Sequence, residues 1–397
     1  MEKLKTKLFA AGITALALSA CGTASDSQMT VSGLNPADFD STINGKKTEL
    51  VTIKNNNGME VCLTNYGGRV VSVSVPDKNG KATDVVLGYD NIRQYADTLN
   101  SPSDFGSSVG RYANRIKNAK LTVAGKTYNL TPNDNGNTLH GGANTGWQNK
   151  VYDVQSKTDS SVVFTITSPD GDNGFPGTVK ATATYTVKSD NTLDIVFQAT
   201  TDKETVINMT NHSYFNLNGD PSKVGDNMVV YINADNFTPS DTLYIPTGEI
   251  RKVEGTPMDF RKPHALSKDI NNFSYDQIKN ATGFDHNWCL NTFKDGKGDD
   301  KTVAASLYSP VTGILMEVYT NEPGIQMYTG NFQGTGIACK HGIKYPKHVS
   351  VCFESQKYPD SPTKITNKTV GWEYSNPYLK PGEKYYSHLA YKFSVKK

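Results

Sequence analysis

The sequence lacks an excess of charge of either sign. Its 397 residues contain 41 Lys and Arg against 39 Asp and Glu, which gives a formal net charge of +2. The first 20 residues hold three lysines and one glutamate, so their removal would leave a net charge of zero. A neutral chain gives no electrostatic reason to bind nucleic acid, and we expect no nucleic-acid partner.

The N-terminal apolar run is too short to cross a membrane as a stable helix. Residues 8–17 are apolar, follow a lysine-rich start and lead into Leu18-Ser19-Ala20-Cys21. This ending resembles the bacterial lipoprotein signal, in which cleavage leaves the cysteine as a lipid-bearing first residue. The alternative is an ordinary secretory signal cleaved nearby. We therefore expect an extracytoplasmic protein that touches a bacterial membrane only through lipid on Cys21.

The segment after Cys21 lacks hydrophobic periodicity and is rich in Ser, Thr, Asp and Gly. Such a composition favours a flexible tether. We expect a signal peptide over residues 1–20, a tether over 21–45 and one catalytic domain over 46–397, because no shift in composition divides the remainder.

Patterns of metal-binding residues are also missing. The cysteines beyond Cys21 are widely spaced with no Cys-x-x-Cys, and no pair of the seven histidines has the spacing of a helical or hairpin ligand set. We expect buried free thiols at Cys62, Cys289, Cys339 and Cys352, and no metal.

Long helical patterns are absent, whereas strand patterns recur from Thr48 to the end. Apolar and polar residues alternate along residues 193–200 and 314–319, and shorter apolar runs are bounded by Gly, Asn, Asp or Pro. The sequence therefore predicts an all-β protein, built as one large antiparallel β-sandwich.

Two strand-like runs each carry one side chain suited to proton transfer. His212 follows the β-rich residues 205–210, and Glu354 lies within Val351-Cys352-Phe353-Glu354. A histidine and a glutamate held by stiff strands could act on two atoms of one substrate. Each residue taken alone could instead be a buried polar group that only stabilises the fold.

Six segments in order resemble the aldose 1-epimerase, or mutarotase, family, and the resemblance covers roughly residues 46–397. They are Gly110-Arg111-Tyr112-Ala113-Asn114-Arg115-Ile116, Leu139-His140-Gly141-Gly142, Asn211-His212-Ser213-Tyr214-Phe215-Asn216-Leu217, Phe284-Asp285-His286-Asn287, Pro323-Gly324-Ile325-Gln326-Met327-Tyr328-Thr329-Gly330-Asn331 and Phe353-Glu354-Ser355-Gln356.

The resemblance implies a galactose mutarotase-like supersandwich that interconverts the α and β anomers of free aldohexoses such as galactose and glucose. It implies no cofactor, a monosaccharide partner, Glu354 as base, His212 as acid and His140 beside the ring oxygen. Ordinary pKa values, about 4.3 for Glu and about 6.5 for His, would leave Glu354 mostly ionised and His212 partly protonated. A nearby negative charge would be needed to keep the proton on His212.

The remaining site residues also follow from the resemblance. Asp285 is expected to accept hydrogen bonds from sugar hydroxyls, and Gln326 to lie in the pocket. Arg115 would donate to a hydroxyl or to a neighbouring carboxylate, with Asn114 fixing its loop and Arg111 serving the structure. His286 and His348 are expected to be structural.

The sequence departs from the family after the His-Gly-Gly segment, where Trp147 is displaced and leaves the shape of one pocket wall open. Two alternative functions remain at this point. One is a glycoside hydrolase or lyase, with Asp285 and Glu354 as its carboxylate pair. The other is a sugar-binding surface module without activity. The sequence does not rank sugars, and we expect a monomer or weak dimer.

Overall fold

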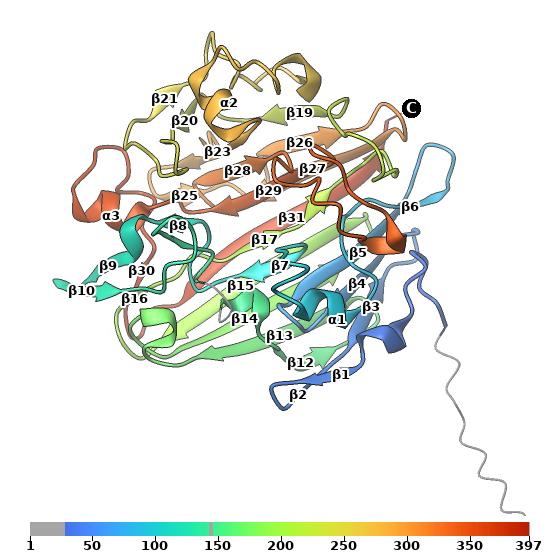
Figure 1. The fold of residues 1–397 in the computed structure, drawn as a ribbon, viewed down its shortest axis with the longest axis horizontal. Helices are drawn as coiled ribbons and strands as arrows, with labels where there is room; N and C mark the ends of the chain where they lie inside the picture. Colours follow the sequence, from blue (N-terminus) through green and yellow to red (C-terminus); the bar gives the residue numbers. More distant parts are fainter. Residues whose placement is uncertain (1–27, 143–145, 397) are drawn as a thin grey trace, which may run out of the picture.

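Three antiparallel sheets form the body of the protein (Figure 1). The computed structural model describes residues 28–142 and 146–396. The largest sheet has nine strands in the order β12-β13-β14-β15-β31-β27-β26-β19-β22. Its strands are β12 (Asp153–Lys157), β13 (Ser161–Ser168), β14 (Val179–Val187), β15 (Thr192–Thr201), β19 (Val229–Ile232), β22 (His264–Ala265), β26 (Ala305–Tyr308), β27 (Ile314–Thr320) and β31 (Tyr385–Val395).

A six-stranded and a four-stranded sheet accompany it, ordered β18-β29-β28-β23-β20-β21 and β3-β4-β5-β6. The first contains β18 (Tyr214–Phe215), β20 (Asn236–Thr238), β21 (Arg251–Lys252), β23 (Asp285–Cys289), β28 (Gly324–Tyr328) and β29 (Val351–Gln356). The second contains β3 (Leu50–Lys54), β4 (Glu60–Thr64), β5 (Arg69–Pro76) and β6 (Ala82–Asp84).

Short two-stranded ribbons and three short α-helices accompany the three sheets in the described residues. The ribbons pair β1 (Ser41–Ile43) with β2 (Lys46–Thr48), β7 (Ser107–Val109) with β17 (Thr210–His212), β8 (Arg115–Ile116) with β11 (Thr138–Leu139), β9 (Lys120–Val123) with β10 (Lys126–Asn129), β16 (Thr205–Val206) with β30 (Tyr378–Leu379) and β24 (Phe293–Lys294) with β25 (Lys297–Gly298). The helices are α1 (Ile92–Ala96), α2 (Asp276–Ala281) and α3 (Ser361–Thr366).

The inner faces of the three sheets share one hydrophobic core. Along β14 the buried positions alternate with partly exposed ones, from Val179 to Val187. Residues of β4, β5, β14, β15, β28 and β31 belong to one cluster of buried apolar side chains. This period-two burial confirms the predicted all-β sandwich, in which strands such as β4 and β28 are buried on both faces.

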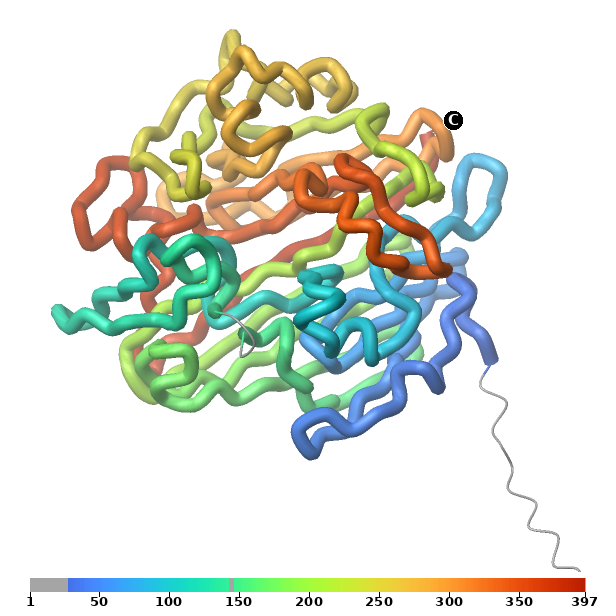
Figure 2. Tube along the Cα trace, viewed as in Figure 1, coloured from blue at the N-terminus to red at the C-terminus, as the bar shows by residue number. Residues whose placement is uncertain are grey.

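The segment near residue 340 crosses the sheets to reach the first third of the chain (Figure 2). The backbone N–H of Lys340 donates to the carbonyl of Gly88 at 2.9 Å, and the Lys340 ammonium lies 2.6 Å from Asp84. Loops from both ends of the chain are thus brought to the same side of the sandwich.

The expected tether does not extend to residue 45. Leu34 and Phe39 are buried in a second apolar cluster with Tyr95 and Cys62, and β1 pairs with β2. Two large apolar side chains gain enough burial to order this segment despite its polar composition. Residues 1–27, which include Cys21, lie outside the described residues.

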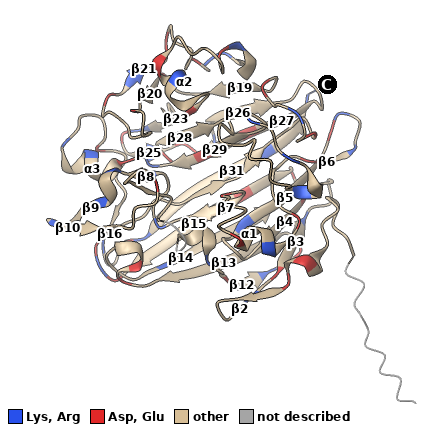
Figure 3. Cartoon of the chain, viewed as in Figure 1, with Lys and Arg blue, Asp and Glu red and all other residues tan. Residues whose placement is uncertain are grey.

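The described cysteines are free thiols, and residues of opposite charge are mixed along the chain (Figure 3). Cys62, Cys339 and Cys352 are buried free thiols as expected, and Cys289 is a free thiol that is only partly buried. Basic and acidic residues are interspersed over the face shown in Figure 3. Within residues 28–142 and 146–396, no helix is long and apolar enough to cross a membrane.

His388 on β31 forms a pH-dependent link between two carboxylates. Its Nδ1 lies 2.7 Å from Asp300 and its Nε2 3.0 Å from Asp194, and hydrogen bonding to Asp194 raises its pKa above 6.5. A raised folded-state pKa gives stability that is fully present below the unfolded value and is lost as pH rises through the folded value.

We therefore expect His388→Gln to lower the free energy of unfolding by about 1 kcal/mol near pH 6 and by much less near pH 9. Urea midpoints at the two pH values measure the difference. An equal loss at both would mean that the ring contributes packing rather than charge.

Candidate active site

Strand register places His212 opposite Glu354. Tyr214 of β18 pairs with Cys352 of β29 in an antiparallel ladder. Continuing the same register beyond β18 would set His212 of β17 against Glu354 of β29, on the same face of the strands as Tyr214 and Cys352. The His212 Nε2 lies 3.6 Å from the Glu354 Oε1, and both side chains are buried. The two residues predicted from separate strands therefore meet.

His140 approaches the same point from the end of β11. Its ring centroid lies 5.2 Å from that of His212, with the rings nearly perpendicular. The Asn114 backbone N–H donates to its Nδ1 at 3.1 Å, and the His140 N–H donates to the Asn114 carbonyl at 3.1 Å. Because Nδ1 accepts, the neutral ring carries its proton on Nε2.

The loops that hold His140 approach each other too closely for any residue but glycine at one position. Gly141 has φ of +80°, and a Cβ there would lie 2.2 Å from the Gly110 carbonyl oxygen. Asn114 itself has φ of +62°, a conformation that asparagine tolerates better than most residues. Its Oδ1 accepts from the Arg115 N–H at 2.9 Å. Asn114 thus fixes the loop as expected and also lines the cavity.

Asp285 enters the site from β23 and is held by Gln326 of β28. The Gln326 Nε2 donates to the Asp285 Oδ1 at 2.7 Å, and Gln326 pairs with Glu354 across β28 and β29. Asp285 lines the cavity, whereas Gln326 is buried behind it. Gln326 was expected in the pocket wall. It lies behind Asp285 instead and orients the Asp285 carboxylate.

Arg115 uses its guanidinium on a neighbouring carboxylate, one of its two expected partners. Its Nε lies 2.6 Å from the Asp134 Oδ2, and the group stacks 4.7 Å from the centre of the Tyr244 ring. Fixed in this way, Arg115 still faces the cavity beside Asn114.

The residues expected to be structural make structural contacts. Arg111 is buried and donates to the carbonyls of Ser168, Pro176 and Gly177 at 2.8–3.1 Å. The Nδ1 of His286 accepts from the Asp285 N–H at 3.2 Å. Trp147 packs against Gly110 in the core and does not line the cavity.

The converging side chains enclose a cavity of about 340 Å³. Its floor is polar and its walls are largely aromatic. It is lined by Tyr89, Pro102, Ser103, Asp104, Phe105, Asn114, Arg115, Leu139, His140, His212, Tyr214, Asp285, Tyr328, Phe332, Gln333, Thr335, Ile337, Cys339 and Glu354. A small polar ligand fits this combination, because ring faces can cover it while the charged groups contact its hydroxyls.

Burial dominates the protonation of the reactive pair. Burial lowers the pKa of His212 below 6.5, although Asp104 opposes this, and burial raises the pKa of Glu354 well above 4.5. Both shifts disfavour the charged forms, so burial opposes the ionised Glu354 that ordinary pKa values predict. The pair instead favours neutral partners that hold one proton between them.

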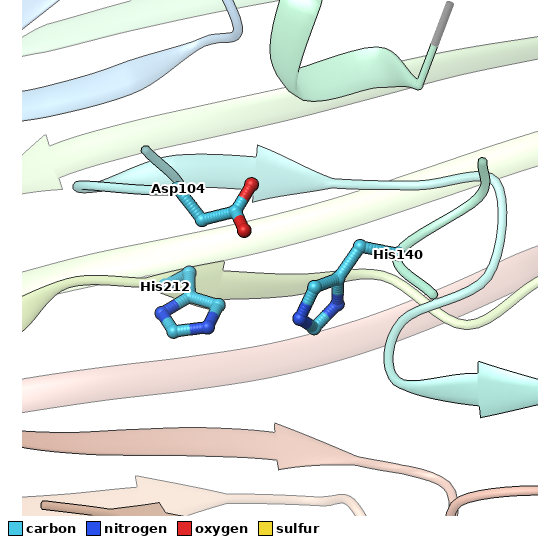
Figure 4. Close-up of side chains that lie close together, drawn as sticks. All are labelled: Asp104, His140 and His212. Atoms are coloured by element: carbon cyan, nitrogen blue, oxygen red, sulfur yellow. The ribbon is translucent and has the colours of Figure 1, made fainter. Parts of the chain in front are cut away.

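Asp104 is a site residue that the sequence did not single out. Figure 4 shows its carboxylate beside the His140 and His212 rings, and ligand-type atoms of the three residues lie within 4.8 Å of one another. Asp104 belongs to no motif and stands in a loop before β7. Its only sequence signal is its place six residues before the Gly110–Ile116 segment.

Known proteins are similar to this chain in sequence and in fold. The sequence model of the aldose 1-epimerase family matches residues 49–392. The chain belongs to the aldose 1-epimerase family. It is an isomerase that interconverts the α and β anomers of aldoses, as the resemblance of the six segments had implied.

Relatives cover nearly the whole epimerase domain. The galactose mutarotase of Bos taurus is 39% identical over 338 residues, which are 85% of this chain and 92% of the relative. The aldose 1-epimerase of Escherichia coli is 36% identical over 349 residues, 88% of this chain and 96% of the relative. Among solved structures, an aldose epimerase homologue from C. elegans superposes with a TM-score of 0.78 at 30% identity, covering 88% of this chain and all of that one. A galactose 1-epimerase from Lactobacillus acidophilus gives 0.75 at 28% identity, covering 90% and 97%.

His140 is expected to remain neutral throughout the working range of the epimerase. Burial lowers its pKa to about 3, so the ring should act as a fixed donor through Nε2. In nitrogen-15 NMR of the histidine rings, the His140 resonance should be that of a neutral Nε2–H ring that does not titrate between about pH 5 and 8. A His140 titration centred near 6.5 would contradict the assignment, and the His140→Asn variant identifies the resonance.

Proposed function

We propose that Glu354 and His212 carry out anomer exchange on free aldohexoses, galactose among them, in this cavity. The observation that supports the proposal is the buried pair at 3.6 Å, which opens into a polar cavity with aromatic walls. One member can accept a proton and the other can donate one, and the pair is held by strands rather than by loops.

Ring opening needs one proton to leave the sugar and one to arrive. Glu354, in its carboxylate form, takes the proton of the C1 hydroxyl while the bond between C1 and the ring oxygen breaks. The electron pair of that bond goes to the ring oxygen, which takes a proton from His212. The open-chain aldehyde then rotates about the C1–C2 bond, and closure in the reverse sense gives the other anomer.

The buried pair is suited to this exchange because the reactive and the resting forms differ by the position of one proton. Moving the proton from Glu354 to His212 converts two neutral groups into the base and the acid without changing the total charge. The reaction should therefore fail when the pair gains a second proton at low pH and when it loses its last proton at high pH.

His140 and Asp285 complete the binding of the sugar. The His140 Nε2–H is available as a donor to the ring oxygen or to the hydroxyl of an adjacent carbon. Asp285, oriented by Gln326, can accept from two neighbouring hydroxyls, and Arg115 can donate to one. These contacts hold the C1 hydroxyl and the ring oxygen against the base and the acid, and such positioning can contribute a large part of the rate acceleration.

Replacing either member of the pair should remove most of the activity. We expect Glu354→Gln and His212→Asn each to lower kcat by about 10²- to 10⁴-fold, because each removes one proton-transfer group. Polarimetry of freshly dissolved α-galactose and α-glucose measures the acceleration over the spontaneous rate and also ranks the two sugars. Arg251→Gln, a change in an exposed ion pair on β21, serves as the control. Full activity in both pair variants would contradict these roles.

We also propose that the epimerase works outside the cytoplasm, held to a bacterial membrane by lipid on Cys21. The support is the sequence alone: a lysine-rich start, a short apolar run and Leu18-Ser19-Ala20-Cys21. An enzyme there could equilibrate sugars released by hydrolases before transporters that prefer one anomer take them up.

The Cys21→Ser variant should lose the lipid and leave the membrane fraction. Fractionation of cells that express the full chain, together with metabolic labelling by a radioactive fatty acid, measures both properties. The Cys62→Ser variant, which changes a buried thiol of the domain, is the matched control and should stay with the membrane. Labelling that persists in Cys21→Ser would rule out this anchor.

A further inference from the structure

The loop that carries Asp104 is held rigidly by a buried arginine. Arg69 of β5 donates to the Phe105 carbonyl at 2.9 Å and to the Ser103 carbonyl at 3.1 Å, on either side of Asp104. The Ser107 N–H donates to the Asp104 carbonyl at 3.0 Å. The backbone of Asp104 is thus fixed on both sides, which restricts where its carboxylate can lie.

The same loop is tied to the strand of the catalytic histidine. Ser107 of β7 pairs with His212 of β17, and the Gly106 N–H donates to the His212 carbonyl at 2.9 Å. Asp104, three residues before Ser107, is therefore tied by backbone hydrogen bonds to the strand that carries His212. Ring nitrogens of both histidines lie within 4.8 Å of the carboxylate (Figure 4).

No cation pairs with the Asp104 carboxylate within 4.0 Å in the part of the chain that the structure describes. Arg69 directs its donors to backbone carbonyls, and Arg115 pairs with Asp134. The charge of Asp104 is therefore not cancelled locally, and it acts on the two imidazoles at a distance where an opposite charge is effective.

The other groups that face His212 do not replace this charge. Tyr214 stacks on the ring at 4.9 Å between centroids, and Tyr328 and His140 meet it edge-on at 6.4 and 5.2 Å. Glu354 lies at 3.6 Å, but it becomes neutral whenever it holds the shared proton. Asp285 also raises the pKa of Glu354 and Arg115 lowers it, whereas Asp104 is the carboxylate that raises the pKa of both His212 and Glu354.

We propose that Asp104 is a positioning residue that keeps the shared proton on the His212–Glu354 pair and so sets the pH range of the epimerase. The inference rests on the roles given to that pair under the proposed function. A fixed negative charge favours every state with one more proton. Burial pushes the proton off the imidazole, and Asp104 opposes that effect from a position that leaves the sugar-binding groups free.

The arrangement of one carboxylate and two histidines also matches a set of metal ligands, but the hydrogen bond of His140 opposes this use. Its Nδ1 accepts from the Asn114 N–H, so the Nε2 that faces the cavity carries the proton. A metal at Nε2 would need the proton on Nδ1, where it would point at another N–H. The cluster is better suited to holding protons.

The test is the pH dependence of kcat/KM, measured by polarimetry on α-galactose or α-glucose, whichever is turned over faster. In Asp104→Asn, both limbs of the profile should move to lower pH by roughly one unit, while the height at the optimum changes little. Above the alkaline limb the variant should be about tenfold slower than the wild type. Asp104→Glu retains the charge and should keep both limbs within a few tenths of a unit.

The control variant removes an equal charge elsewhere. Asp220→Asn changes an exposed carboxylate that pairs with Lys223 and should leave the profile in place. NMR titration of the His212 ring gives a second readout, and its midpoint should fall in Asp104→Asn.

Three outcomes would overturn the proposal. Limbs that stay in place while the height falls would mean that Asp104 only shapes the loop. A rise in KM with unmoved limbs would make it a sugar ligand instead. An unchanged profile would give it no role. If His212→Asn were fully active, the roles proposed for the pair would fail, whereas unmoved limbs in Asp104→Asn beside an inactive His212→Asn would reject the Asp104 inference alone.

Discussion

The antiparallel pairing of β18 with β29 is the constraint on which the active site depends. It fixes His212 and Glu354 at facing positions, because Tyr214 pairs with Cys352 and each reactive residue lies two positions further along. A shift of one residue between the two strands would turn one of these side chains to the opposite face of the sheet and separate the pair. The surrounding core, which extends through all three large sheets, makes such a shift costly.

Burial shifts the pKa values of His212 and Glu354 and so controls where their shared proton lies. In water a glutamate and a histidine would carry opposite charges near neutral pH, but burial disfavours both charged forms and brings the neutral pair closer in free energy to the ion pair. A single proton can then move between them without a large change in solvation. The same burial lowers the pKa of His140 to about 3 and keeps it a neutral donor, so two nearby imidazoles take different roles. The two imidazoles differ in their neighbours. His140 accepts a hydrogen bond from the Asn114 N–H, whereas His212 lies 3.6 Å from Glu354.

The loops contribute what the strands cannot. Strands present side chains at fixed intervals, whereas the groups around a sugar ring must approach from several directions. Asn114 and His140 therefore lie at loop positions with positive φ, and Gly141 allows two backbones to touch. Arg69 donates to two backbone carbonyls of the loop that carries Asp104. These hydrogen bonds fix the position of the loop, although loops are usually more mobile than strands.

The sequence by itself determined the fold class, the family and the residues with chemical function. The alternation of apolar and polar residues and the order of six segments were enough, because both patterns are formed by residues that are neighbours in the chain. His212, Glu354, His140 and Asp285 were identified in this way, and the structure brings them together around one cavity. Tertiary structure alone decided three other features. It ordered residues 28–45 by burying Leu34 and Phe39, it placed Gln326 behind Asp285, and it brought Asp104 to the two histidines. Each of these features depends on contacts between residues far apart in the chain, or on the exclusion of solvent that such contacts produce. The local pattern of the sequence does not specify either one.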